Sequence, residues 1–145
     1  MKQTKISRYI YSLITMLFVA ATLTGCSNLQ QQLQAKMADP VAEDYLTKML
    51  DAVEKNDVDA AEQLFSSEYV SREDLENGID VIGRLWDGGT YTYQLTYSGI
   101  NSSFVNGKTE KFNVRKYEVV TQDHTYSVDI TYVDGKGMVG FNLTR

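Results

Sequence analysis

Two residue types that carry out much of protein chemistry occur once each in this chain of 145 residues, as Cys26 and His124. A cysteine sulfur can act as a nucleophile or as a point of covalent attachment. A histidine ring can transfer protons near neutral pH. Cys26 stands directly after an apolar segment near the N-terminus, whereas His124 stands in the C-terminal half. The two residues therefore predict different chemistry, covalent attachment at Cys26 and proton transfer at His124.

An export signal is predicted for residues 1–25. Lys2, Lys5 and Arg8 make the start positive, and an uncharged apolar run then extends from Ile10 to Leu23. That run is shorter than the roughly 20 residues that a transmembrane helix needs, and no pattern that would stop transfer follows it. We therefore expect residues 1–25 to be a secretion signal that is removed.

The segment Leu23-Thr24-Gly25-Cys26 resembles the lipobox of bacterial lipoproteins, in which a small residue precedes an invariant cysteine. The resemblance implies a diacylglycerol group on the Cys26 sulfur, cleavage after Gly25, and acylation of the new amine, for example with palmitate. Two acyl chains hold a protein stably in a bilayer, whereas one chain binds marginally. The alternative is an ordinary cleaved signal followed by an unrelated cysteine. However, Cys26 has no second cysteine in the chain with which to form a disulfide.

The net charge argues against two other kinds of partner. It is −5 for the whole chain, and removal of the three cations of the signal makes it −8. Nucleic acid and anionic lipid are both bound through clustered Lys and Arg residues, which this chain lacks. We therefore expect no nucleic-acid partner, and membrane attachment only through lipid at Cys26. The expected location is the extracytoplasmic face of the cell membrane, or the outer membrane if the envelope is Gram-negative.

Residues 26–38 are predicted to be the lipidated N-terminus and a tether, and residues 39–145 to be a single domain. The tether is Gln-rich and polar and contains neither Gly nor Pro. The rest of the chain has the length and the apolar content of one globular domain. The tether is short, so we expect the domain to lie close to the bilayer.

Three helices are predicted at the start of the domain. Asp39 and Pro40 form a typical helix start, because Asp caps free amides and Pro at the first helical position loses no hydrogen bond. Apolar residues at helical spacing then predict a helix over 40–55. A short second helix follows, and a third begins at Ser71 with the spacing of a capping box and ends at Asp87. The inward positions expected for this third helix are Leu75, Ile79, Ile82 and Leu85.

Four strands are predicted after Thr90, where apolar residues begin to recur at every second position. The first strand carries its apolar side chains at Tyr91, Tyr93, Leu95 and Tyr97. Asn106 and Gly107 predict a hairpin, and a change of phase predicts a bulge in the returning strand near Arg115 and Lys116. Helices followed by an antiparallel meander predict the α+β class, with N-terminal helices packed on a curved four-strand antiparallel sheet.

The order of these elements resembles that of the nuclear transport factor two-like superfamily, in which a cystatin-like curved sheet wraps the helices as a cone. The resemblance spans residues 40–145 and includes the stretch EKNDVDAAEQLFS at 54–66. That stretch is similar to a segment of many small lipoproteins of the superfamily whose function is unassigned. The resemblance implies a cone domain and, in the enzymes of the superfamily, a pocket His or Asp that acts as general acid or base.

His124 is the catalytic candidate that this resemblance implies. It shares the apolar phase of its strand with Tyr126 and Val128, so it could point into the cone. A catalytic histidine needs a partner that sets its tautomer and pKa, and the sequence does not name one. The alternative is a solvated residue in the turn that precedes the strand.

Four aromatic residues are candidates for ligand binding, because aromatic rings with polar tips suit a pocket for an amphipathic ligand or a protein contact. They are Tyr91, Tyr93, Tyr126 and Trp86. Aromatic residues are equally typical of strands and cores. The alternative is therefore that these four residues fill the core.

The leading hypothesis is a lipid-anchored, non-enzymatic domain that binds an envelope protein or a small ligand. The sequence has no phosphate-binding Gly-rich loop, no zinc-binding cluster of Cys and His, and no EF-hand loop. We therefore expect no cofactor and no metal. The alternatives are a cone-pocket enzyme of the hydrolase or isomerase type that uses His124, and a structural or immunity-type partner without a pocket.

Overall fold

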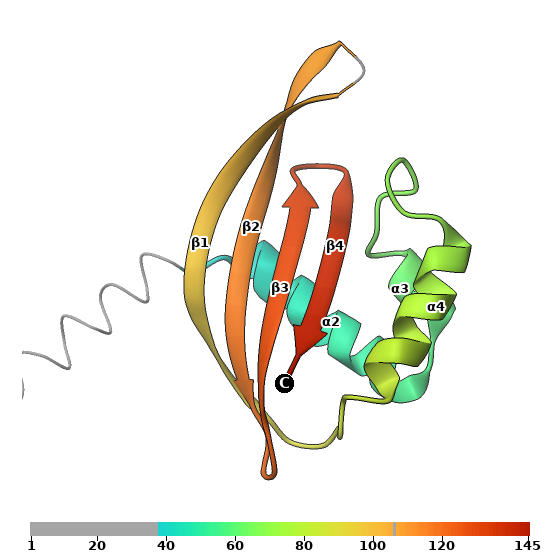
Figure 1. Cartoon of the computed structure of the whole chain (residues 1–145), viewed down its shortest axis with the longest axis vertical. Helices are drawn as coiled ribbons and strands as arrows, with labels where there is room; N and C mark the ends of the chain where they lie inside the picture. The colour runs from blue at the N-terminus through green and yellow to red at the C-terminus, as the bar shows by residue number, and fades with distance from the viewer. Residues whose placement is uncertain (1–37, 106) are drawn as a thin grey trace, which may run out of the picture. The chain divides into compact units, whose positions relative to one another are not determined.

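The computed structural model of the chain describes residues 38–105 and 107–145 (Figure 1). The predicted signal at 1–25, the predicted lipidation site Cys26 and nearly all of the predicted tether lie outside these residues. Asp39–Arg145 form one compact unit. No helix among the described residues is both long and apolar enough to cross a bilayer.

In the described part of the chain, three helices precede four strands. The helices are α2 (Pro40–Lys55), α3 (Val58–Glu62) and α4 (Arg72–Gly83). The strands are β1 (Thr92–Val105), β2 (Lys108–Val120), β3 (Thr125–Val133) and β4 (Gly137–Thr144). They pair antiparallel in the order β1-β2-β3-β4, and the β1–β2 hairpin bends and extends beyond the other two strands (Figure 1). The predicted α+β class with helices before a four-strand antiparallel sheet is confirmed.

The helices begin where their capping residues predict. Asp39 accepts a hydrogen bond from the Ala42 N–H at 3.1 Å and caps α2. Ser71 and Asp74 form the predicted capping box of α4, in which each side chain accepts from the backbone N–H of the other residue. These bonds satisfy N–H groups that have no partner within the helix.

The end of α4 differs from the prediction. The helix ends at Gly83 rather than at Asp87, because the N–H groups of Leu85 and Trp86 both bond to the Ile82 carbonyl and tighten the chain. This turn directs Trp86 into the core, where 7% of it is exposed, and leaves Leu85 exposed at 38%. The prediction that Leu85 continues the inward stripe of the helix is therefore wrong.

The predicted bulge lies in β1 and not in β2. Leu95 pairs with Tyr117 and Tyr97 pairs with Lys116, so Thr96 is the extra residue. An extra residue reverses the faces of all side chains beyond it. Tyr97 therefore leaves the inward phase that Leu95 occupies and lies on the outer face of the sheet, where it was not expected.

The strand β2 keeps a single phase along its length. Its inward residues are Asn113, Arg115, Tyr117 and Val119. Phe112 and Val114, whose phase suggested a bulge near Arg115 and Lys116, lie in the opposite phase. The sequence pattern was misleading because the inward phase contains two polar residues there and the outward phase contains two apolar ones.

The core lies between α2 and the inward face of the sheet. Leu46, Leu50 and Met49 of α2 are almost completely buried. The sheet covers them with residues of β2, β3 and β4, which are Tyr117, Val119, Tyr126, Val128, Ile130, Tyr132, Met138 and Leu143.

A buried ion pair connects the start of α2 to the sheet. The Asp39 carboxylate lies 2.7 Å from Nε of Arg115, and both side chains are 12% exposed. The same carboxylate accepts a hydrogen bond from the Tyr132 hydroxyl at 2.5 Å. Burial raises the pKa of Asp39, but the hydrogen bonds from Tyr132 and Ala42 and the charge of Arg115 outweigh it, so the pKa lies below its ordinary value. Asp39 therefore stays ionised, and its carboxylate interacts both with the first turn of α2 and with Tyr132 and Arg115 of the sheet.

The outer edge of β4 begins against the chain that follows α3. The Ser66 N–H donates to the Met138 carbonyl, and the Met138 N–H donates to the Leu64 carbonyl, each at 2.8 Å. Gly137 has a φ of +109°, and a Cβ there would lie 2.9 Å from the Leu64 carbonyl oxygen. The approach of the two segments therefore requires glycine at this position.

We expect Gly137→Ala to lower the free energy of unfolding by about 1 to 3 kcal/mol, because it combines a disfavoured φ with a close contact to backbone. Urea unfolding followed by circular dichroism measures this difference. The control is Gly83→Ala, at a helical position where a Cβ meets nothing within 4 Å. It should raise stability by up to about 1 kcal/mol. Equal effects of the two substitutions would contradict the role given to Gly137.

Candidate functional site

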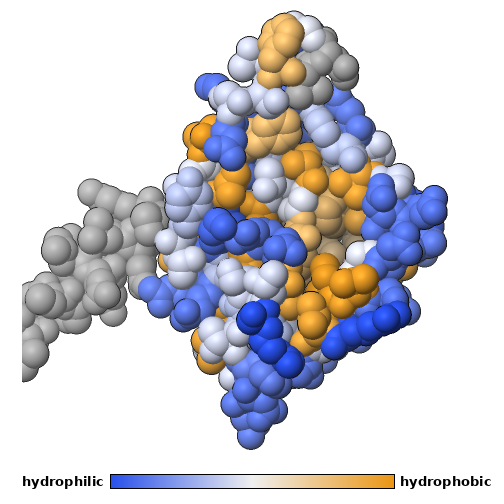
Figure 2. Space-filling model, viewed as in Figure 1, coloured by the Kyte–Doolittle hydropathy of each residue, from blue (hydrophilic) through white to orange (hydrophobic). Residues whose placement is uncertain are grey.

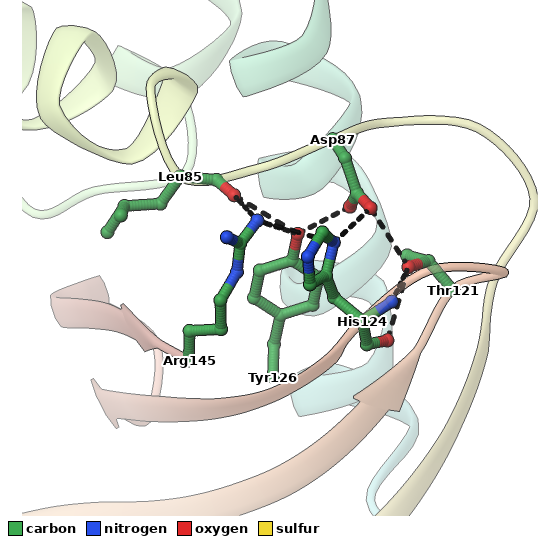
Figure 3. A network of polar contacts seen from close by, with 6 residues as sticks. All are labelled: Leu85, Asp87, Thr121, His124, Tyr126 and Arg145. Atoms are coloured by element: carbon green, nitrogen blue, oxygen red, sulfur yellow. Dashed lines mark hydrogen bonds and ion pairs between the residues drawn. The ribbon is translucent and has the colours of Figure 1, made fainter.

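His124 lies in the turn between β2 and β3 and forms a polar pair with Asp87 (Figure 3). Its Nδ1 is 2.8 Å from Oδ2 of Asp87, and the two side chains are 36% and 25% exposed. Thr121 holds the turn, since its hydroxyl accepts from the His124 N–H and its own N–H donates to the His124 carbonyl. The structure thus supplies the partner for His124 that the sequence did not name.

Asp87 is held in place from two further directions. The Tyr126 hydroxyl donates to its Oδ1 at 2.5 Å, and the Thr121 hydroxyl donates to its Oδ2 at 3.2 Å. Buried Trp86 precedes it and fixes the loop after α4. The hydrogen bonds from His124 and then from Tyr126 lower the pKa of Asp87 to about 2. Asp87 is therefore a carboxylate at any physiological pH.

The carboxylate determines the tautomer of the neutral His124 ring. Because ionised Asp87 can only accept hydrogen bonds, Nδ1 must carry the proton. Nε2 then presents a lone pair, and no described residue forms a hydrogen bond with it. An Asp–His pair of this form can in principle accept a proton at Nε2.

Arg145 completes the network on the other side of the ring. Its Nη2 lies 3.2 Å from the Leu85 carbonyl and 3.3 Å from the Tyr126 hydroxyl, and its guanidinium stacks over the Tyr126 ring with its carbon 5.5 Å from the centroid. It also lies 3.3 Å from Nδ1 of His124, which is already directed at Asp87. The network therefore joins β4, β3 and the loop after α4, as well as surrounding His124.

The four aromatic candidates for ligand binding lie next to one another. Trp86 packs against Tyr126 and Tyr91 with ring centroids 5.2 and 5.6 Å apart, and Tyr91 lies 6.4 Å from Tyr93. Trp86 and Tyr126 are buried, Tyr91 is half-buried and Tyr93 is exposed at 39%. Their side chains thus contact each other and the core, and ligand binding at these residues stays a prediction.

An apolar cleft opens elsewhere, between α4 and β4. It has a volume of ≈ 180 Å³. Its walls are mainly hydrophobic side chains and two glycines, and Asp74 is the one charged residue that lines it in the described part of the chain. The residues that line it are Met49, Phe65, Val70, Asp74, Leu75, Gly78, Ile79, Ile82, Val139, Gly140 and Phe141. Figure 2 shows hydrophobic side chains gathered beside β4 and bordered by hydrophilic ones along the outer side of α4.

Neither the Asp87–His124 pair nor the apolar cleft was predicted from the sequence. Asp87 was interpreted only as the end of a helix, because Gly88 and Gly89 follow it. The cleft combines residues of α2, α4 and β4 that are far apart in the chain. Nothing in the sequence reports the distance between α4 and the sheet edge, so no signal could have revealed this cleft.

Metal ligands do not gather in the described part of the chain. Among residues 38–105 and 107–145, no group of three or more His, Cys, Asp or Glu side chains is arranged to hold a metal ion. The prediction that the protein uses no cofactor is not tested by this observation.

The family described as a domain of unknown function (DUF5104) matches residues 48–138, which is more than half of the chain. The chain belongs to this family. The match includes Asp87 and His124 but neither Cys26 nor Arg145. No curated protein and no solved structure matches the chain. The resemblance to the nuclear transport factor two-like superfamily therefore stays a prediction.

We expect Asp87→Asn to destabilise the protein at neutral pH, with an effect that disappears in acid. The folded pKa of about 2 lies below the ordinary value of 3.8, so the carboxylate contributes stability above pH 3.8 and loses it as pH falls toward 2. Urea unfolding at several pH values measures the difference between variant and wild type.

Asp123→Asn is the matched control, because it removes the same charge next to His124 and Asp123 makes no ion pair with a described residue. Its effect should be small at every pH. The ¹⁵N spectrum of the single histidine adds a second measurement, since Asp87→Ala leaves Nδ1 without the acceptor at residue 87 and should remove the preference for a proton on Nδ1. An Nδ1 proton preference that persists in Asp87→Ala would contradict the role given to the carboxylate.

Proposed function

We propose that this member of the DUF5104 family is a lipoprotein, held at the extracytoplasmic face of the membrane by lipid on Cys26, whose domain binds an envelope protein without transforming it. The observation that carries the binding role is the open apolar cleft between α4 and β4. The membrane attachment rests on the N-terminal sequence.

The attachment is supported by the order of the N-terminal features. A positive start, an apolar run and a small residue before Cys26 follow one another at the spacing of a lipoprotein signal. The net charge of −8 after removal of the signal cations disfavours binding to anionic lipid by the domain itself. Lipid on Cys26 is therefore the attachment that the chain favours.

The size of the cleft supports a protein partner over a metabolite. Small-molecule sites usually have about 300 to 1,000 Å³, whereas this cleft has ≈ 180 Å³. An apolar cavity of about 150 Å³ accommodates a benzene-sized group. The cleft is therefore suited to one large apolar side chain of a partner.

A second candidate function is favoured by the Asp87–His124 pair. Its 2.8 Å contact and the open Nε2 are the arrangement of a general base. The pair lies at the end of the sheet and is not among the residues that line the apolar cleft. An enzyme of the hydrolase or isomerase type would thus bring its substrate to a partly exposed ring, which disfavours catalysis relative to binding.

We expect Cys26→Ser to release the exported protein from membranes, because a hydroxyl cannot accept the diacylglycerol group as a thioether. Fractionation of cells and labelling with an alkyne fatty acid measure this change. Ser27→Ala is the control and should stay lipidated. A Cys26→Ser protein that still sediments with membranes after export would contradict the proposal that lipid on Cys26 anchors the protein.

We expect a photoreactive analogue of valine at position 139, in the wall of the cleft, to crosslink the full chain to a discrete partner in intact cells. The matched control is the same analogue at Val81, which is exposed on α4 outside the cleft. Crosslinking at 139 but not at 81 is the expected result. Equal products at both positions, or none at 139, would contradict binding at the cleft.

A further inference from the structure

The strand β4 is the edge of the sheet, and among residues 38–105 and 107–145 the segment that pairs with this edge covers its beginning. Met138 forms a parallel bridge with Phe65, through backbone bonds of 2.8 Å to the residues on either side of Phe65. Beyond Met138, no other described strand pairs with this edge. Unpaired backbone groups at a strand edge are a ready template for a further strand.

The helix α4 lies beside this edge but leaves space between them. The apolar cleft occupies that space, with Leu75, Gly78 and Ile79 on the side of α4 and Val139, Gly140 and Phe141 on the side of β4. A Cβ at Gly78 would meet nothing within 4 Å. The lack of a side chain at Gly78 therefore keeps the space next to the strand edge open.

We infer that this space takes an extended peptide segment of a partner protein, which adds to the edge of β4 as a fifth strand and places one large apolar side chain in the cleft. The inference rests on the proposed binding function. The segment would pair with β4 after the bulge at Val139, beyond the pairing that residues 64–66 make at Met138. Backbone hydrogen bonds would supply affinity, and the cleft would select the side chain.

The charges around the cleft favour basic residues in the partner. Asp74 lines the cleft, and its carboxylate bonds to Ser71 and to no cation among the described residues. The two arginines nearby are already engaged, Arg72 with three carboxylates and Arg84 with one. A peptide with Lys or Arg beside its apolar residue would therefore complement this rim.

The dimensions favour a strand over a helix. A helix with its side chains is about 10 to 12 Å wide and needs a groove for several anchors along one face. The cleft holds about one large side chain, and it lies along backbone that can form strand hydrogen bonds. An extended segment can use both features, whereas a helix could place one side chain in the cleft but could not form the strand hydrogen bonds.

The test uses a displayed library of linear heptapeptides, selected on the full chain purified in detergent and counter-selected on its Gly78→Leu variant. We expect enriched peptides to alternate in polarity, with a central Leu or Phe and flanking Lys or Arg. A synthetic copy should bind Gly78→Leu about tenfold more weakly or worse than wild type. It should bind the Gly83→Leu variant as well as wild type, because Gly83 is on the same helix outside the cleft.

A second measurement separates strand addition from simple side-chain docking. N-methylation of alternate backbone amides of the peptide should abolish binding in one register and leave it intact in the other, and bound peptide should slow amide exchange in residues 139–143. Binding that is lost in Gly78→Leu but insensitive to N-methylation overturns the fifth strand and leaves the cleft as a binding site. Failure to enrich any peptide overturns the inference, whereas failure of the Val139 crosslink overturns the proposed function.

Discussion

The fold depends on a carboxylate that serves a helix and a sheet at the same time. Asp39 caps α2 through the Ala42 N–H and pairs with Arg115 and Tyr132 of the sheet. Arg115 in turn donates to the Gly99 carbonyl, so the contact reaches β1 as well. A buried ion pair stabilises a fold only when the other hydrogen-bonding groups of its members are also satisfied. Asp39 and Nη1 of Arg115 meet that requirement, whereas Nε of Arg115 contacts Asp39 as an ion pair without a well-directed hydrogen bond. The cluster connects the start of α2 to the sheet and so helps to determine which residues of α2 form the core.

A second polar connection holds the opposite end of the molecule. The Asp87 carboxylate joins the loop after α4 to the turn between β2 and β3, through His124, Tyr126 and Thr121. Trp86 is buried in the core and packs against the ring of Tyr126. Between these two connections, α4 leaves the apolar cleft beside β4.

The sequence predicted what local patterns determine. The helix starts could be predicted because their capping residues, Asp39, Ser71 and Asp74, bond to residues close by in the chain. The alternation of apolar and polar residues predicted the four strands. The pairing of Asp87 with His124 could not be predicted from local patterns, because 37 positions separate the two residues. The bulge was assigned to the wrong strand because Arg115 points inward, and a polar residue in the inward phase hides the true register. Arg115 is tolerated on the inward face of β2 because it pairs with Asp39. This contact exists only in the tertiary structure.

The position of α4 also affects how two copies of this domain can meet. An exposed strand edge usually risks joining the edge of a second sheet, and natural proteins often protect such edges by covering them. Here α4 stands beside the edge, across the apolar cleft. A second sheet that approached β4 edge to edge would meet this helix, so α4 shields the edge sterically and disfavours edge-to-edge assembly of whole sheets.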